Sequence, residues 1–133
     1  MLTVYVSAPL RGAEGEAGKT FCAEAREEAQ QAGRPGGFEL RVVCLDAAGP
    51  EGRWALAQVG ANARRATEDS TAVAYLGEPS RAARRQSQPI LEAAGIAELG
   101  GLSGKEAMAE VVAAIEDSDS GDPRRAVFDV VEG

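Results

Sequence analysis

The chain has 133 residues, of which 44% are hydrophobic and only 5% aromatic, and it carries a formal net charge of −7. A chain of this length forms one domain, with a core built mainly from Ala, Val, Leu and Ile. The acidic balance argues against a general nucleic-acid-binding protein, which needs a basic surface to displace counterions from phosphates. No apolar run approaches the roughly 20 residues that a membrane span needs.

The N-terminal stretch MLTVYVSAPLRG enters a strand directly. It has no basic segment followed by an apolar run and no small-residue cleavage site, which together mark a signal peptide. Two alternatives follow, and the sequence leaves both open. Either the protein is cytoplasmic, or the chain begins after a signal peptide that has been removed.

The chain contains no His and two Cys, Cys22 and Cys44. Without His, the common Ser-His and Cys-His nucleophile pairs are excluded, as is any His-ligated metal. The two Cys form no CxxC motif, so neither a zinc site nor a thioredoxin-type redox site is indicated. Each Cys lies on the apolar side of its predicted element, which favours a small buried thiol. We therefore expect no catalytic residues, no metal and no cofactor.

The first half of the chain predicts two strands and two helices. Residues 2–8 are mostly apolar, as is typical of a strand buried on both faces. A Gly-rich loop over 9–18 precedes a helix over 19–32, whose apolar residues share one face. A second strand over 38–46 alternates apolar and charged residues, which predicts an edge strand. A second helix is predicted over 53–68.

The stretch TAVAYLG, residues 71–77, is almost entirely apolar and predicts a third, central strand. Ser80 is positioned to cap the helix that follows. A proline inside a helix removes a hydrogen bond, so we expect Pro89 to begin a separate helical segment. A short fourth strand is predicted over 96–99.

The C-terminal part predicts two helices with clear start signals. Ser103 and Glu106 fit a capping box, in which each side chain satisfies a free backbone N–H group of the other residue. Asp122 is predicted to cap the last helix, with Pro123 at its first position.

This alternation predicts an α/β fold: a three-layer αβα, flavodoxin-like (Rossmann-like) open parallel sheet of order 2-1-3-4 in a single lobe. In such folds, ligands bind beyond the carboxyl ends of the strands, where the strand order reverses. Here that place lies between the loops after the first and third strands. The candidate ligand-binding residues are Ser7, Ala8, Pro9, Leu10, Gly77, Glu78, Ser80 and Arg81. The first N–H groups of the helix after Ser80 suit an anion such as a carboxylate.

Three further features each have a functional and a structural interpretation. Arg81, Arg84 and Arg85 share a helical face that could attract an acidic ligand, but a solvated basic face is favoured. Trp54 could stack on a ligand, although closing the core or an interface is favoured. Asp46 could bind an amine or a metal, although it has no second acid beside it. A turn or cap role is therefore favoured.

Four segments carry a resemblance to a known family: VYVSAPLRG, GGFELRVVCLDAAG, ANARRATEDSTAVAYLGEPS and QPILEAAGI. Together they resemble the first lobe of type I periplasmic solute-binding proteins, most closely the branched-chain amino-acid receptors of ABC transporters. The resemblance covers residues 2–96. The segment GKEAMAEVVAAIEDSDSGDPRRAVFDVV is similar to a later helical segment of that family, which returns from the second lobe to the first.

The resemblance implies a periplasmic, two-lobed clamp that closes on a free amino acid or a similar small molecule. Its first lobe holds the ligand carboxylate with hydroxyls and backbone N–H groups, here expected from residues 7–10 and 77–81. The Ser/Thr-rich run of the family is reduced to Ser80, and the second lobe is missing. Residues 1–99 then form the core of lobe one, residues 100–104 a Gly-rich splice, and residues 105–133 the returning helices.

Three classes of function follow. The first is a solute-binding lobe with weak or vestigial binding of a small carboxylate-bearing molecule. The second is a non-catalytic scaffold that forms a homodimer through the former inter-lobe face. The third, a small flavodoxin-like enzyme or a response-regulator relative, is disfavoured. No paired acids follow the first strand, and no GxxxxGK[ST] motif occurs. We expect the first class, with no enzymatic activity, and we expect a homodimer.

Overall fold

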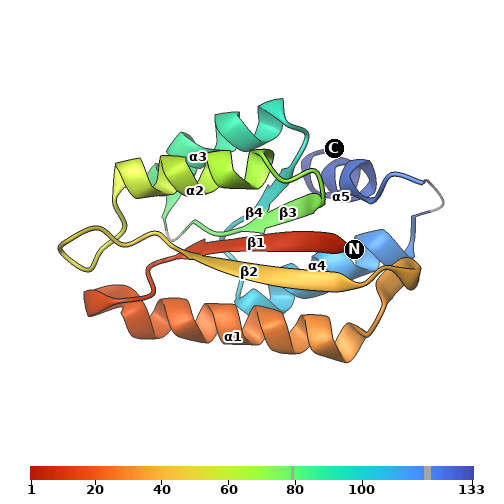
Figure 1. Cartoon of the computed structure of the whole chain (residues 1–133), viewed down its shortest axis with the longest axis horizontal. Helices are drawn as coiled ribbons and strands as arrows, with labels where there is room; N and C mark the ends of the chain where they lie inside the picture. Colours follow the sequence, from red (N-terminus) through yellow and green to blue (C-terminus); the bar gives the residue numbers. More distant parts are fainter. Residues whose placement is uncertain (79, 119–120) are drawn as a thin grey trace.

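The computed structural model describes residues 1–78, 80–118 and 121–133. It contains a four-stranded parallel sheet in the order β2-β1-β3-β4 (Figure 1). The strands are β1 (Leu2–Ala8), β2 (Leu40–Asp46), β3 (Ala72–Leu76) and β4 (Ala97–Leu99). The predicted sheet order is therefore confirmed.

Helices cover both faces of the sheet (Figure 1). They are η1 (Gly12–Glu14), α1 (Gly15–Ala32), η2 (Pro35–Gly37), α2 (Leu56–Thr67), α3 (Arg81–Ala93), α4 (Gly104–Glu116) and α5 (Pro123–Glu132). α1 and α4 pack together on one face, with α5 against α4, β3 and β4, whereas α2 and α3 pack on the other face. The three predicted layers are confirmed. No helix in the described part of the chain is long and apolar enough to cross a membrane.

The core has a large part on the α1 and α4 side and a smaller part on the α2 and α3 side. Val4, Met108 and Val111 are fully buried in the larger part, and Tyr75 and Leu91 are fully buried in the smaller one. Every residue of β1 and β3 is buried, as expected of central strands. β2 is mostly half-buried, which agrees with its edge position.

The N-caps predicted for the last three helices are present. The Ser80 side chain accepts a hydrogen bond from the Ala83 N–H group, and Ser103 forms the full capping box with Glu106. The Asp122 side chain caps α5. Each cap satisfies a backbone donor that the helix itself leaves free, which explains why these helices begin where they do.

The predicted loop over residues 9–18 is wrong in its second half, because α1 begins at Gly15. Gly15 and Gly18 are both buried in the first turns of this helix. A Cβ atom on Gly18 would overlap the carbonyl oxygen of Pro9. These glycines therefore permit close packing of α1 on the end of β1, and they do not form a turn.

The expectation that Pro89 begins a separate helical segment is also wrong. α3 is one helix over Arg81–Ala93, with Pro89 inside it. Pro89 lies at an exposed position, as does Arg85 one turn earlier. Pro89 has no N–H group to donate to the Arg85 carbonyl oxygen, but because both residues are exposed, water can solvate that oxygen and the helix continues.

The interpretation of Cys22 and Cys44 as separate buried thiols is wrong. They form a disulfide that joins α1 to the edge strand β2, with their Cα atoms 6.2 Å apart. Both residues are half-buried. The packing of α1 across β2 brings the two positions together, and spacing along the sequence does not reveal such a contact.

Candidate ligand-binding site

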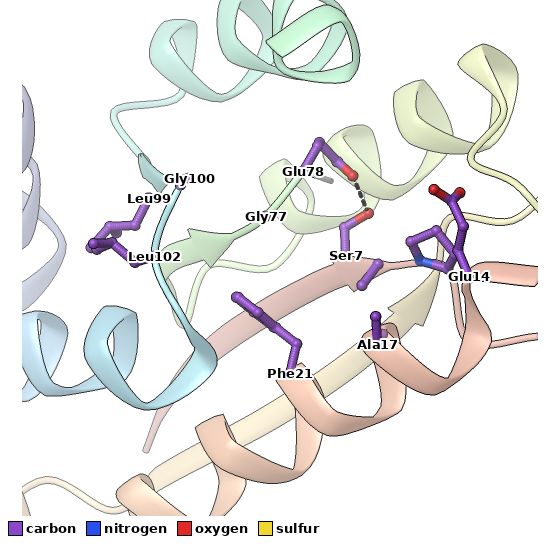
Figure 2. A pocket seen from close by; sticks show the side chains of 13 residues that line it. Ser7, Glu14, Ala17, Phe21, Gly77, Glu78, Leu99, Gly100 and Leu102 are labelled. Carbon is purple, nitrogen blue, oxygen red and sulfur yellow. Dashed lines mark hydrogen bonds between the residues drawn. The ribbon is translucent and has the colours of Figure 1, made fainter. Parts of the chain in front are cut away.

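A cavity of about 330 Å³ lies at the carboxyl ends of β1, β3 and β4, bounded by the start of α1 (Figure 2). Its lining residues are Ser7, Ala8, Pro9, Glu14, Ala17, Gly18, Phe21, Gly77, Glu78, Leu99, Gly100, Gly101 and Leu102. This volume lies at the lower end of the range of roughly 300–1,000 Å³ that small-molecule sites occupy. The place agrees with the rule for open parallel sheets, since the strand order reverses between β1 and β3.

The two loops expected to form a site do meet in the structure. Of the eight candidate residues, five line the cavity: Ser7, Ala8, Pro9, Gly77 and Glu78. The other three lie elsewhere. The Leu10 N–H group donates to Asp46, the Ser80 side chain caps α3, and Arg81 lines a separate cavity. Whether any of the eight residues binds a ligand remains a prediction.

Glu78 is the centre of a buried hydrogen-bond network at the top of the sheet. Its Oε1 atom accepts a hydrogen bond from the Ser7 hydroxyl at 2.8 Å, and its Oε2 atom accepts one from the Tyr75 hydroxyl at 2.5 Å (Figure 2 shows the first). The Asn62 side-chain amide donates to Ser7 Oγ at 3.0 Å. All four side chains are at most 5% exposed. The network therefore joins β1, α2 and β3 to the wall of the cavity.

The environment of Glu78 changes its acidity. Burial raises the pKa of its carboxyl group to about 7, although the hydrogen bonds from Tyr75 and Ser7 act in the opposite direction. Burial, and then the neighbouring Glu78, raises the pKa of Tyr75 well above the ordinary value. Glu78 thus changes charge near neutral pH, whereas Tyr75 keeps its proton and stays a hydrogen-bond donor.

The side chains in the rest of the cavity wall are apolar apart from one further carboxyl group, and Gly18, Gly77, Gly100 and Gly101 line it with backbone. Glu14, which is half-buried at the end of η1, accepts a hydrogen bond from the Trp54 backbone N–H group at 3.3 Å. Phe21 of α1 and Leu102 supply much of the apolar wall (Figure 2). Among the described residues that line the cavity there is no Lys or Arg. The site therefore combines two carboxyl groups with apolar side chains and exposed glycine backbone.

Sequence reasoning missed several contributors to the site. Asn62 is a polar residue on the apolar side of α2, and Tyr75 has a hydroxyl group within a buried strand. Both residues could have indicated a buried hydrogen-bond network from the sequence, because buried polar groups need hydrogen-bond partners. Glu14 and Phe21 gave no comparable signal, since their position at the cavity depends on where α1 begins.

The structural interpretations of Asp46 and Trp54 agree with their surroundings. Asp46 Oδ1 accepts hydrogen bonds from the N–H groups of Leu10 and Ala48, both at 2.9 Å, and its other oxygen pairs with Arg11. Asp46 therefore ties the loops after β1 and β2 together. Trp54 is half-buried against a small apolar cluster. Within the described residues, no group of acids or Cys is arranged to hold a metal ion.

A second cavity of about 240 Å³ lies beside α3, lined by Arg81, Arg84, Arg85, Gln88 and Glu98. Arg81 and Arg85 are exposed, which agrees with a solvated basic face. Glu98 Oε2 accepts a hydrogen bond from the Ser87 hydroxyl at 2.6 Å. Burial raises the pKa of Glu98 to about 8.

Comparison with solved structures finds matches that all belong to one class of binding protein. The structure matches branched-chain amino-acid-binding proteins of the type I periplasmic kind. A leucine-binding protein from Thermotoga maritima superposes with a TM-score of 0.65 at 20% identity, covering 75% of this chain and 27% of its own. A Rhodospirillum rubrum protein assigned to branched-chain amino acid ABC transport gives 0.66 at 25% identity, covering 77% of this chain and 29% of its own.

A third match is a branched-chain amino acid transporter substrate-binding protein from Streptococcus pneumoniae, in complex with isoleucine. It gives a TM-score of 0.62 at 16% identity and covers 75% of this chain and 28% of its own. No family model matches the sequence, and no curated protein matches it. This chain thus spans less than a third of the length of the matched structures, as expected for a single lobe, and the predicted family resemblance is confirmed at the level of fold.

Proposed function

We propose that this protein is a binding lobe for a small amino-acid-like solute, held in the cavity at the carboxyl ends of β1, β3 and β4. The observation that carries the proposal is the cavity itself. It pairs ionisable groups with an apolar wall at the point where the strand order reverses. An amino acid with an apolar side chain has the same two kinds of surface. The fold match to amino-acid-binding proteins supports this interpretation.

We expect binding to be weak. The cavity is open on one side, and a closing lobe normally excludes water and supplies further contacts. In this proposal residues 100–104 replace that lobe and join the core, residues 1–99, directly to the helices of residues 105–133. The packing of Met108 and Val111 against the strands of the main core supports this arrangement.

The homodimeric scaffold remains a second prediction, but the surface gives it no particular support. The large hydrophobic residues exposed in the described part of the chain are Met1, Leu56 and Val130. None of them lines the cavity. A dimer through the cavity face would therefore need contacts other than an exposed apolar patch.

The test is an amide-resolved NMR titration with free apolar amino acids, on a sample of known mass in solution. We expect saturable shifts confined to the amides around the cavity. A matched pair of variants on α1 sharpens the test, since Ala17 and Ala23 are both exposed and only Ala17 lines the cavity. Ala17→Trp should fill the cavity and abolish the shifts, and Ala23→Trp should leave them unchanged. Absence of shifts at millimolar ligand, or equal binding by both variants, would rule out the proposal.

A further inference from the structure

The ionisable side chains that line the cavity, within the described residues, are Glu14 and Glu78. The remaining lining side chains are apolar, apart from the hydroxyl group of Ser7. A carboxylate entering this space would meet two acidic groups at short range, with no described Lys or Arg in the wall to compensate. Like charges in a partly water-excluded site repel each other strongly.

While Glu78 is ionised, the hydrogen bonds of the network have one direction, because the carboxylate can only accept. Asn62 donates its amide proton to Ser7 Oγ, so the Ser7 hydroxyl proton is directed to Glu78. Tyr75 donates to the other oxygen of Glu78. Ser7 therefore has no proton left for a ligand carboxylate. The Gly77 N–H group is also engaged, since it donates to the Leu99 carbonyl oxygen at 3.0 Å.

Glu78 itself retains capacity to bind a donor. An ionised carboxylate has about four acceptor positions, and the two hydroxyl groups use one on each oxygen. Both protein partners donate to Glu78, so what it offers to the cavity is acceptor capacity. Any hydrogen-bond donor can use this capacity, and for the ionised form of Glu78 a donor with positive charge makes the strongest bond.

We propose that the cavity selects its ligand through an ammonium group, with Glu78 as the principal counter-ion and Glu14 as a second acidic contact at the rim. The hydrocarbon part of the ligand lies against Phe21 and Leu102. A carboxylate, where the ligand has one, points to the open side of the cavity. This inference rests on the proposed function and reverses the orientation expected from the sequence, in which these loops hold a carboxylate.

The test uses three probes with the same branched hydrocarbon chain: leucine, 3-methylbutylamine and 4-methylpentanoate. The second lacks the carboxylate of leucine, and the third lacks its amine. By amide-resolved NMR titration we expect leucine and the amine to shift the cavity amides. We expect 4-methylpentanoate to bind at least about tenfold more weakly than the amine, since it cannot form a hydrogen bond between oppositely charged groups. A carboxylate that binds as well as the amine overturns this inference and leaves the proposed function standing. If none of the three binds, the proposed function itself fails.

Variants assign the selectivity to a residue. Glu78→Gln keeps the size and an acceptor oxygen but removes the charge, so we expect it to weaken amine binding by about tenfold or more. Glu110→Gln, on the exposed face of α4, is the matched control and should bind as the unmodified protein does. Unchanged amine binding by a folded Glu78→Gln variant overturns the assignment. Glu14→Gln provides a second variant at the rim, which should reduce amine binding by a smaller factor.

Discussion

Glu98 shows how one buried carboxyl group can make stability depend on pH. Its Oε2 atom is hydrogen-bonded to Ser87, whereas its Oε1 atom is buried and has no hydrogen-bond partner among the described residues. Burial accordingly raises the pKa of Glu98 to about 8, and the nearby Glu78 adds to this effect. The folded protein thus favours the protonated, neutral form of Glu98.

At the scale of this residue, we expect Glu98→Gln to remove one contribution to the pH dependence of the free energy of unfolding. Because the folded pKa of Glu98 lies above that of the unfolded chain, its contribution is complete below about pH 4.5 and is lost as the pH rises to about 8. Glutamine does not ionise, so the variant should gain stability relative to the unmodified protein between pH 5 and pH 8.5. Urea unfolding at both pH values measures this difference, with Glu110→Gln as the exposed control. Parallel pH profiles would contradict the expectation.

At the scale of elements, the disulfide between Cys22 and Cys44 ties the long helix α1 to the edge strand β2. The two residues are separated by 22 positions, and closing a loop of that size restricts the unfolded chain. We expect the double variant Cys22→Ser, Cys44→Ser to lose about 3 kcal/mol in the free energy of unfolding. Urea unfolding with and without reductant checks this value. The double variant should not respond to reductant, and a response would show that the effect has another source.

A second contact between elements depends on the absence of a side chain. Gly104, at the start of α4, lies so close to α1 that a Cβ atom would overlap the Phe21 carbonyl oxygen. Gly104→Ala should therefore lower the free energy of unfolding by about 1–3 kcal/mol, the usual cost of overpacking. Gly121→Ala is the control, since a Cβ atom there would meet none of the described residues within 4 Å. Thermal unfolding of both variants distinguishes this packing effect from helix propensity, which would make Gly104→Ala stabilising.

These elements also show what the sequence could and could not predict. The bounds of β1 and the order of the sheet followed from which strands were apolar on both faces and which alternated. The beginning of α1, the continuity of α3 through Pro89 and the pairing of Cys22 with Cys44 did not follow. Each of these depends on what lies across the interface, and local patterns of residues do not record that.

The same limit applies to the site. The two strand-end loops could be predicted, because the topology of an open sheet fixes where its ligands bind. The direction of the hydrogen bonds around Glu78 could not, since Asn62 and Ser7 come from different elements. Without that direction the loops were expected to bind a carboxylate.

At the scale of the whole molecule, the two buried carboxyl groups and the net charge change stability in the same direction: both make the folded protein more stable as the pH falls from 8 toward 5. The formal charge is −7 at pH 7, and the sequence pI is about 4.7, so self-repulsion decreases as the pH falls toward 5. Glu78 and Glu98, with pKa values of about 7 and about 8, also favour the folded state at the lower pH. Asp69 opposes further acidification, because the Thr71 hydroxyl above all lowers its pKa to about 2.

We therefore expect the protein to be more stable near pH 5 than at pH 8, and to lose stability again below about pH 4 as Asp69 takes up a proton. Thermal unfolding at pH 3, 5 and 8 at constant ionic strength measures this profile. Added salt should raise the melting temperature more at pH 8 than at pH 5, because it screens the repulsion between like charges. A melting temperature highest at pH 8 would contradict the expectation.

The hydrogen bond between the Trp54 backbone and Glu14 has an optical consequence. Trp54 is the single tryptophan of the chain, and its neighbour Glu14 forms part of the cavity rim. The indole ring itself packs against the cluster of Ala47, Val59 and Ala83, so the cavity rim reaches Trp54 through the hydrogen bond to its backbone and not through its ring. The emission of this one fluorophore therefore reports whether occupancy of the rim is transmitted along the backbone to the far side of that loop.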